Sequence, residues 1–218
     1  MSYGGLTSGG KDSILAIQKA LDRGIPVSHL ITVRPNDPYS YMFHSSNLDA
    51  VPAIAQVSGL QYHEIATHGR KEEELNDLED GLRALPVEGI ITGAIASQYQ
   101  RERIELVAHR LALDVYAPLW GMDPLDLMRE VAARLDAMIV VVAADGLTEE
   151  VLGARIDASL IDRLQRISDR YHIHLAGEGG EYETLTLRAP FYHRSVTYAT
   201  AEIVSSLGRS ELVLEGFT

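Results

Sequence analysis

The hexapeptide SGGKDS at residues 8–13 constrains the fold of this chain more than any other segment. It follows a short strand-like run, residues 3–7, and opens a helix-like run, residues 11–23. Its two glycines let the backbone approach a bulky anion closely. The start of the helix directs free N–H groups and the positive end of the helix dipole at that anion. The serine hydroxyls and Lys11 add donors and positive charge, so the segment predicts a phosphate-holding loop between a strand and a helix.

Two known nucleotide loops compete for this segment. Residues 5–11, GLTSGGK, satisfy the first seven places of the pattern G-x-x-x-x-G-K-[ST]. The eighth place is Asp12, where that loop needs a hydroxyl group for magnesium. The pyrophosphatase loop, S-G-G-x-D-S, is instead met at every position. Enzymes with this loop resemble one another in cleaving ATP between the α and β phosphates. The alternative without function is a glycine-rich turn with a Ser/Asp cap.

Strand-like and helix-like segments alternate through the first half of the chain. In the run 11–23, apolar residues such as Ile14, Ile17 and Leu21 share one face, the spacing of a buried stripe. This order predicts a parallel sheet with helices on both faces, in which ligands collect at the carboxyl ends of the strands. We therefore expect a Rossmann-like α/β domain over residues 1–122. It contains the pyrophosphatase loop, or PP-loop, and is called the PP-loop domain. Its further helices are expected at 47–57, 70–85 and 97–112, and its further strands at 27–33, 61–65 and 89–92.

Beyond the first domain the pattern changes. Helix-like runs at 125–135 and 159–171 flank an almost wholly apolar strand-like run, residues 138–142. Beyond Gly177 the helical period is lost and β structure is expected. We therefore expect a smaller α+β domain over residues 123–218. Its last strands are expected at 184–187, 195–205 and 211–214.

The amino-acid composition excludes several classes of binding partner and of cofactor site. The formal charge of −12 argues against a broad nucleic-acid footprint, which needs clustered Lys and Arg. The chain has no cysteine, which excludes disulfides, zinc–thiolate sites, iron–sulfur clusters and the thiol chemistry of some tRNA-thiolating PP-loop enzymes. No signal-peptide pattern is visible, and the longest apolar run, residues 137–144, is far short of the roughly 20 residues of a membrane helix. We therefore expect a cytoplasmic protein with no membrane partner and no direct nucleic-acid partner.

Three further segments have a composition suited to substrate binding. Residues 32–47, TVRPNDPYSYMFHSSN, carry aromatic and hydrogen-bonding side chains, although a surface loop explains them equally well. Residues 93–105, GAIASQYQRERIE, carry Arg101 and Arg103, which could neutralise phosphate. On spacing alone, a solvated helix face with an i,i+4 ion pair at Arg101 is the favoured interpretation of that segment. Residues 177–184, GEGGEYET, gather three glutamates that a cation would stabilise.

Taken together, these segments resemble the diphthine–ammonia ligases in their archaeal-type, single-module form, a family within the PP-loop ATP pyrophosphatases. The resemblance implies an α/β domain of the adenine nucleotide alpha hydrolase type, then a second domain, with the active site between them. It also implies an ATP-dependent amide ligase. ATP adenylates the carboxylate of diphthine, a modified histidine of translation elongation factor 2, and ammonia then displaces AMP to give diphthamide. The matching segments are SGGKDS at 8–13, PYSYMFHSSN at 38–47, GAIASQYQRERIE at 93–105, PLW at 118–120 and GEGGEYETL at 177–185.

The resemblance also implies roles for individual residues. ATP and Mg²⁺ are the implied cofactors, with Asp12 as the metal ligand and Lys11 offsetting charge on the leaving group. Glu178, Glu181 and Glu183 are the further catalytic candidates, which would face the trimethylammonium group of diphthine or position ammonia. The implied nucleotide-binding residues are Ser8, Gly9, Gly10, Lys11, Asp12, Ser13, Gly93, Gln100, Arg101 and Arg103. The implied substrate-binding residues are Tyr41, His44, Tyr99, Gly177, Gly179 and Gly180.

Three other functions stay open. A PP-loop enzyme that modifies tRNA would predict a basic surface and often catalytic cysteines. A small-molecule amidotransferase would fit the loop but leaves residues 40–44 and 177–184 unexplained. A nucleotide-sensing module would bind ATP without releasing pyrophosphate. The implied partners are elongation factor 2 bearing diphthine and ammonium, and a homodimer is left open. Gly4 and Gly5 depart from the family pattern of an apolar first strand, and we expect them to weaken that strand.

Overall fold

The computed structural model describes residues 2–35, 46–67 and 73–218, which form two sheets with helices packed around them. Within these residues, no helix is long and apolar enough to cross a membrane. In chain order the elements are β1 (Tyr3–Leu6), α1 (Lys11–Asp22), β2 (Val27–Pro35), α2 (Ala50–Ser58), β3 (Gln61–Thr67), α3 (Glu73–Arg83), β4 (Gly89–Ile91), α4 (Gln98–Leu111), β5 (Asp114–Tyr116), α5 (Pro124–Arg134), β6 (Asp136–Val142), the 3-10 helix η1 (Glu149–Val151), α6 (Ala158–Tyr171), β7 (Tyr182–Arg188), β8 (Thr200–Ser206) and β9 (Arg209–Glu215).

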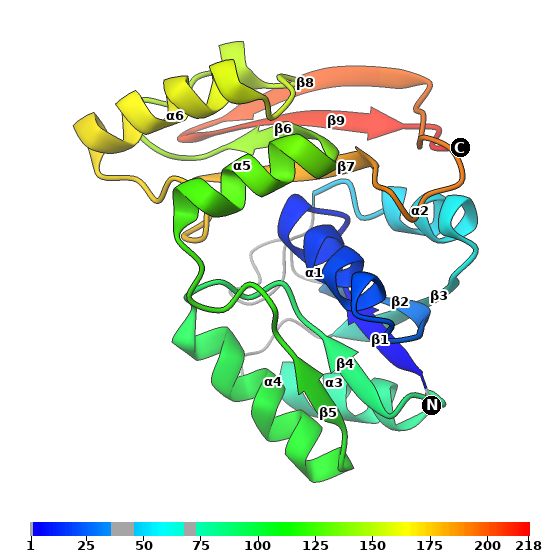
Figure 1. Ribbon diagram of the computed structural model, residues 1–218. Helices are drawn as coiled ribbons and strands as arrows, with labels where there is room; N and C mark the ends of the chain where they lie inside the picture. The colour runs from blue at the N-terminus through cyan, green and yellow to red at the C-terminus, as the bar shows by residue number, and fades with distance from the viewer. Residues whose placement is uncertain (1, 36–45, 68–72) are drawn as a thin grey trace.

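The first five strands form a parallel sheet in the order β3-β2-β1-β4-β5, with β1 at its centre. Helices α1 and α2 lie on one face of this sheet, and α3 and α4 lie on the other (Figure 1). Neighbouring residues of one strand alternate between the two faces. Leu30 accordingly packs in the cluster that contains α1, whereas Ile31 packs in the cluster that contains α3 and α4. The predicted parallel-sheet, Rossmann-like fold of the first half is confirmed.

The two glycines of β1 make room for close packing at the centre of the sheet. A Cβ atom at Gly4 would overlap Ile31 Cδ1, and one at Gly5 would lie 2.5 Å from Ile17 Cδ1 of α1. Both isoleucines are fully buried. The glycines therefore admit larger side chains from both faces of the central strand, which explains their presence where the family pattern is apolar.

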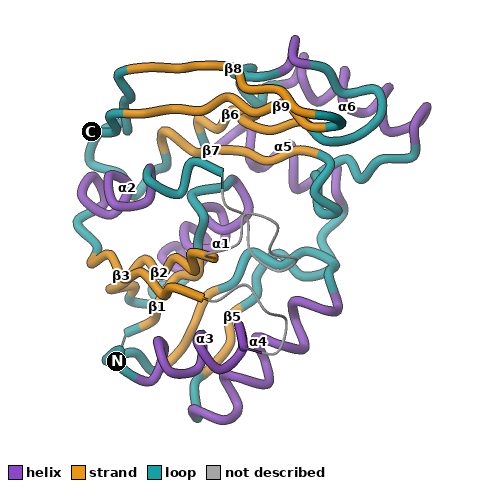
Figure 2. The backbone as a smooth tube through the Cα atoms, turned by 180° about the vertical axis from the view of Figure 1, so that it is seen from behind, coloured by secondary structure: helices purple, strands orange, loops and turns teal. Residues whose placement is uncertain are grey.

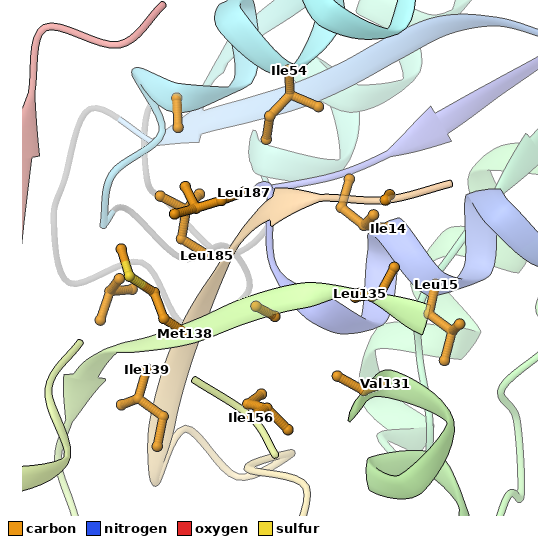
Figure 3. Packing of buried hydrophobic residues seen from close by; sticks show 14 of the residues in the cluster. Ile14, Leu15, Ile54, Val131, Leu135, Met138, Ile139, Ile156, Leu185 and Leu187 are labelled. Atoms are coloured by element: carbon orange, nitrogen blue, oxygen red, sulfur yellow. The ribbon is translucent and has the colours of Figure 1, made fainter. Parts of the chain in front are cut away.

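The remaining strands form a second, antiparallel sheet in the order β7-β6-β9-β8, with α5 and α6 beside it (Figure 2). This is the α+β portion that the sequence predicted. Strand β7 and helix α5 pack against α1, so one hydrophobic cluster joins both parts of the chain. Figure 3 shows Ile14 and Leu15 of α1 beside Leu135, which follows α5, while Leu185 and Leu187 of β7 belong to the same cluster. The domain boundary at residue 122 stays a prediction.

Three differences from the predicted elements have local causes. Strand β5 lies at the edge of its sheet and spans three residues. A strand of that length is too short to produce a recognisable sequence pattern, so it was not predicted. Helix α2 begins at Ala50, because Asn47 has a φ of 53° and its side chain bonds to the β9 backbone at Leu212 and Leu214. Residues 195–199 are not a strand. The Val196 N–H donates to the Leu187 carbonyl of β7, and the Thr197 N–H donates to the Thr218 carbonyl. The segment therefore crosses from one strand to another and is not part of a strand.

Candidate active site

A cleft lies at the carboxyl ends of β1, β2 and β4, where the topology of a parallel sheet is expected to collect a ligand. It brings together four segments that are distant in the sequence. Its lining residues are Leu6, Thr7, Ser8, Gly10, Asp12, Ser13, Ile31, Val33, Thr92, Gly93, Ala94, Gln100, Ile104, Gly177 and Glu178. The predicted site residues among them are Ser8, Gly10, Asp12, Ser13, Gly93, Gln100, Gly177 and Glu178.

The loop between β1 and α1 is held in shape by its own hydroxyl groups. The Thr7 and Ser13 hydroxyl oxygens lie 2.7 Å apart, and the Gly9 N–H donates to Thr7 Oγ1 over 2.9 Å. The Ser13 hydroxyl also donates to the Gly10 carbonyl over 3.0 Å. Gly9 has a φ of 83°, a conformation that favours glycine. Ser13 therefore shapes the loop as well as lining the cleft.

Strand β7 of the second sheet packs directly against this loop. The Thr186 N–H donates to the Gly9 carbonyl over 2.9 Å, and the Lys11 N–H donates to Thr184 Oγ1 over 3.0 Å. A Cβ atom at Gly10 would lie 3.3 Å from the Thr184 carbonyl oxygen. The glycines that were predicted to admit a phosphate therefore also admit β7, and the second sheet fixes the position of the loop.

Lys11 and Asp12 form an ion pair of which only Asp12 lines the cleft. Lys11 is 3% exposed, and its Nζ lies 2.7 Å from Asp12 Oδ2 and 2.6 Å from the Ala176 carbonyl oxygen. The ammonium group also lies 5.5 Å from the centre of the Tyr182 ring. Lys11 in this arrangement compensates the Asp12 charge and joins the loop to the chain at Ala176. Its predicted contact with a leaving group stays a prediction.

Tyr182 is buried beside this pair and is held in its neutral form. Burial is the main cause that raises its pKa well above the usual value for tyrosine, and the charges of Asp12 and Glu181 raise it further. Its hydroxyl donates to the Leu175 carbonyl over 2.7 Å. Tyr182 therefore supports the turn at residues 175–177 as a hydrogen-bond donor.

Gly93 follows β4 and touches the start of α1. A Cβ atom at this position would lie 2.6 Å from the Ser13 nitrogen and 2.7 Å from the Asp12 carbonyl carbon. Both neighbours are backbone atoms, so a side chain here would displace the loop itself. This contact explains why position 93, two residues after β4, carries glycine.

Glu178 joins the second part of the chain to the segment after β4. Its Oε1 accepts N–H groups from Ile95 (3.3 Å), Ala96 (3.0 Å) and Ser97 (2.9 Å). Ser97 is the N-cap of α4, and its hydroxyl accepts the Gln100 N–H over 3.4 Å. The carboxylate thus lies at a helix N-terminus, where a negative charge is stabilised. These are the contacts of an anchor, and a catalytic role for Glu178 stays a prediction.

The other two predicted glutamates do not line the cleft. Glu181 accepts the N–H groups of His174 and Gly179, each over 2.8 Å, and so holds its own turn. Glu183 lies 3.2 Å from Arg209, whose guanidinium also donates to Ser46 Oγ over 2.7 Å. Backbone groups and an arginine thus compensate these carboxylates. Three predicted glycines also lie outside the lining of the cleft: Gly9 of the loop, and Gly179 and Gly180 of the same turn as Glu181.

Helix α4 presents only part of its predicted face to the cleft. Gln100 and Ile104 line it. The Arg101 guanidinium forms an ion pair with Glu105 at 2.6 Å and lies 4.4 Å from the centre of the Trp120 ring. The Arg101 side chain is partly exposed to solvent. Arg103 stacks over the Tyr99 ring at 3.5 Å. Neither arginine lines the cleft, and the predicted Tyr41 and His44 lie outside the described residues.

Sequence reasoning missed several residues of the cleft. Thr7 and Thr92 directly follow β1 and β4, a position that marks them as ligand-facing once the strands are placed. Ile31 and Val33 of β2 form an apolar wall together with Leu6 and Ile104. Both β2 side chains are buried, as expected of a strand inside the sheet, but periodicity does not indicate that the strand also borders a cleft.

The cleft suits a magnesium ion that arrives with a nucleotide. Within the described residues, no group of three or more His, Cys, Asp or Glu side chains is placed to hold a metal. Magnesium in phosphate-binding enzymes is commonly held by one or two carboxylates together with substrate phosphates and water. Asp12, a carboxylate that lines the cleft at the start of α1, fits that mode of binding.

Comparisons with known proteins agree over nearly the whole chain. The model of the diphthamide synthase N-terminal domain matches residues 1–115, and that of the C-terminal domain matches residues 123–211. The chain is 33% identical to the diphthine–ammonia ligases of Rattus norvegicus and Homo sapiens, over 94% of this chain and 85% of each relative. It is 30% identical to that of Saccharomyces cerevisiae, over 88% of this chain and 33% of the relative.

A solved structure described as a predicted subunit of tRNA methyltransferase from Methanocaldococcus jannaschii covers 87% of this chain and 97% of its own, at 16% identity and a TM-score of 0.49. That likeness is too distant to carry an argument. The two domain models do carry one, since together they span the segments that form the cleft, and the curated relatives match over most of the chain. The chain belongs to the diphthamide synthase family.

Proposed function

We propose that this protein is an ATP-dependent ligase that converts diphthine on translation elongation factor 2 to diphthamide, with ammonia as the nitrogen donor. The observation that carries the proposal is the cleft itself. In a chain of this family, the glycine loop at 8–13, the segment after β4 and the turn at Gly177 all face one space. Helix α1 points its N-terminus there, and its N-cap, Gly10, has no side chain to cap the helix.

The proposed reaction has two steps. A carboxylate oxygen of diphthine attacks the α-phosphorus of ATP, the bond from that phosphorus to the bridging oxygen breaks, and pyrophosphate leaves. The nitrogen of ammonia then attacks the activated carboxyl carbon, AMP leaves, and the nitrogen loses a proton to become the amide of diphthamide. AMP and pyrophosphate are therefore the nucleotide products.

The two ends of the cleft suit the two ends of the nucleotide. The polar end, at Ser8, Gly10 and Ser13, would take the phosphates, because hydroxyl groups and the start of α1 meet there. The apolar side of the cleft, at Leu6 and Val33, would take the adenine ring. Asp12 would hold Mg²⁺ with the phosphate oxygens, and the ion would supply positive charge as the leaving group gains negative charge.

The acceptor would enter from the side of the second sheet. Gly177 and Glu178 line that side of the cleft, and Lys11, through Ala176, ties the same turn to the glycine loop. A carboxylate presented there would meet the α-phosphate at the boundary between the two parts of the chain. Arg101 lies outside the lining, so we assign it no contact with the nucleotide.

The proposal is tested by incubating the protein with ATP, magnesium, ammonium and elongation factor 2 that bears diphthine. We expect AMP and pyrophosphate to form together with a mass change from carboxylate to amide on the modified histidine. Release of ADP in place of AMP would exclude cleavage between the α and β phosphates. AMP release without a change in the mass of the factor would point to another acceptor.

The role of Asp12 is tested with Asp12→Asn, which keeps an oxygen to accept from Lys11 Nζ but removes the charge. We expect pyrophosphate release to fall about 100-fold or more, as when an electrostatic group is lost from an active site. Asp126→Asn, at an exposed position of α5, is the matched control and should keep full activity. Full activity in Asp12→Asn would refute the magnesium role.

A further inference from the structure

The β8–β9 hairpin ends the second sheet in an edge that no described strand covers. Among the strands of the described residues, β8 pairs with β9 alone, over seven residue pairs from Thr200↔Glu215 to Ser206↔Arg209. It lies at the outer edge of the molecule, on the side away from the first sheet, in both views (Figures 1 and 2). In an antiparallel ladder every second residue of an edge strand directs its N–H and C=O groups away from its single neighbour. Such an edge is a template for another strand.

The side chains of β8 are exposed on both faces of the strand. All seven of its residues are exposed. Five large apolar side chains of the described residues are exposed, and three of them, Ile203, Val204 and Leu207, lie in this hairpin. Natural edge strands are usually protected by lysine, proline or a bulge. β8 contains none of these and has one charged residue, Glu202.

The opposite edge of the same sheet shows the contrast. Strand β7 is covered by the glycine loop, through Thr186 N–H and the Gly9 carbonyl, and by Val196, whose N–H donates to the Leu187 carbonyl over 2.8 Å. The sheet is therefore closed at β7 and open at β8.

We propose that β8 pairs with β8 of a second copy of this chain, which joins two four-stranded sheets into one continuous sheet across a two-fold axis. Two identical strands related by such an axis run antiparallel, and residues opposite each other must face the same side of the sheet. Ile203 is the midpoint of Thr200–Ser206, so a register centred on Ile203 pairs all seven residues.

The charge pattern favours this register. With Ile203 opposite Ile203 of the second copy, Glu202 faces Val204 and Thr200 faces Ser206. No like charges are then directly opposite, whereas a register centred on Glu202 would place two glutamates opposite each other at an energetic cost. The two isoleucines meet on the axis, which buries the apolar side chains that a single chain leaves exposed.

The net charge predicts how this pairing responds to salt. Each copy carries a formal charge of −12, so the two copies repel each other at long range. Salt at 0.15 M screens such repulsion beyond roughly 8 Å. We expect the dimer dissociation constant to fall as ionic strength rises, the opposite of an interface held by ion pairs.

The proposal is tested by sedimentation equilibrium of the full chain, the Ile203→Lys variant and the Leu106→Lys variant. Ile203→Lys places two lysines opposite each other on the axis, and we expect the dissociation constant to rise roughly tenfold or more. Leu106 is exposed to a similar degree, 42% against 47% for Ile203, but lies on α4, so Leu106→Lys is the matched control and should dimerise normally. Circular dichroism checks that both variants are folded.

A second measurement tests the register and uses the absence of cysteine from the chain. Ile203→Cys should form a disulfide-linked dimer on mild oxidation, because directly opposite residues of antiparallel strands have Cα atoms about 4.5–5.5 Å apart, within disulfide reach. Glu202→Cys should link far less, since its partner is Val204. A monomer at all concentrations and salt levels would overturn the proposal, and so would a dimer that Ile203→Lys leaves intact or equal linking in the two cysteine variants. Since no β8 residue lines the cleft, ligase activity is measured independently of this outcome.

Discussion

Replacing Glu178 by alanine should loosen the segment that connects β4 to α4. The loss in the free energy of unfolding follows from the hydrogen bonds that the change removes. The lost oxygen accepts three N–H groups, those of Ile95, Ala96 and Ser97. Ala96 is exposed, so water can replace its partner, whereas Ile95 is only 1% exposed and its N–H group would stay buried. Leaving one buried N–H group without a partner costs about 1–3 kcal/mol. Removing a negative charge from a helix N-terminus costs a further 0.3–1 kcal/mol, roughly. We therefore expect the free energy of unfolding to fall by about 2 kcal/mol.

The same change should weaken nucleotide binding more than catalysis. Gly93, Ala94 and Gln100 line the cleft on either side of the anchored segment, so a looser segment raises the KM for ATP. Glu178→Gln keeps an accepting oxygen and should recover most of the stability and most of the KM. Urea unfolding gives the stability, and pyrophosphate release at varied ATP separates KM from kcat. Glu105→Ala, which removes an exposed ion pair on α4, is the matched control and should change stability by less than about 0.5 kcal/mol.

One result would refute the assignment of Glu178 as an anchor. If Glu178→Gln keeps the stability and the ATP KM of the parent but loses about 100-fold or more in kcat, the carboxylate takes part in the chemistry. The original prediction of a catalytic glutamate would then hold. A large loss of stability in Glu178→Ala that Gln restores would support the anchor.

Three further outcomes are expected. Gly93→Ala should lose about 1–3 kcal/mol of stability and bind ATP weakly, because its Cβ would overlap the Ser13 nitrogen; parent-like unfolding and KM would contradict this contact. Arg101→Ala should keep kcat/KM within about twofold, since its ion pair is exposed; a tenfold loss would place Arg101 in the binding site. Unfolding free energy should fall above about pH 10, because burial raises the pKa of Tyr182 and Tyr192, which keep their protons while the unfolded chain releases them. Tyr192→Phe should reduce that slope by about 1.4 kcal/mol per pH unit, and an unchanged slope measured by urea unfolding would refute the shift.

The parallel sheet could be predicted because its signals are local. A helix stripe such as Ile14 and Ile17 repeats within one or two turns, and a buried strand such as β2 is a short apolar run between turns. β5 was missed for the same reason: three residues beside β4 contain no repeat. Residues 195–199 were wrongly predicted as strand, because the loss of helical period does not distinguish a strand from a segment whose backbone bonds to two different parts of the chain.

The candidate site could be predicted in part. Ser8, Gly93 and Gly177 come from three motifs and do line one cleft. Arg101 was predicted to bind the nucleotide because of its positive charge. In the structure its guanidinium contacts Glu105 and Trp120. Sequence reasoning identifies the residues suited to bind phosphate, but the orientation of each around its helix depends on what packs there.

The sequence by itself determined that a phosphate loop joins β1 to α1 in an α/β sheet, because glycine, serine and helix spacing act over a few neighbouring residues. The tertiary structure decided which partner each charge has. Lys11 reaches the Ala176 carbonyl across 165 residues, and Glu178 reaches Ile95 across 83. Those pairings exist because β7 packs on the glycine loop and α1 lies between the two sheets. Contacts of that range depend on the packing of whole elements, and no local pattern in the chain encodes them.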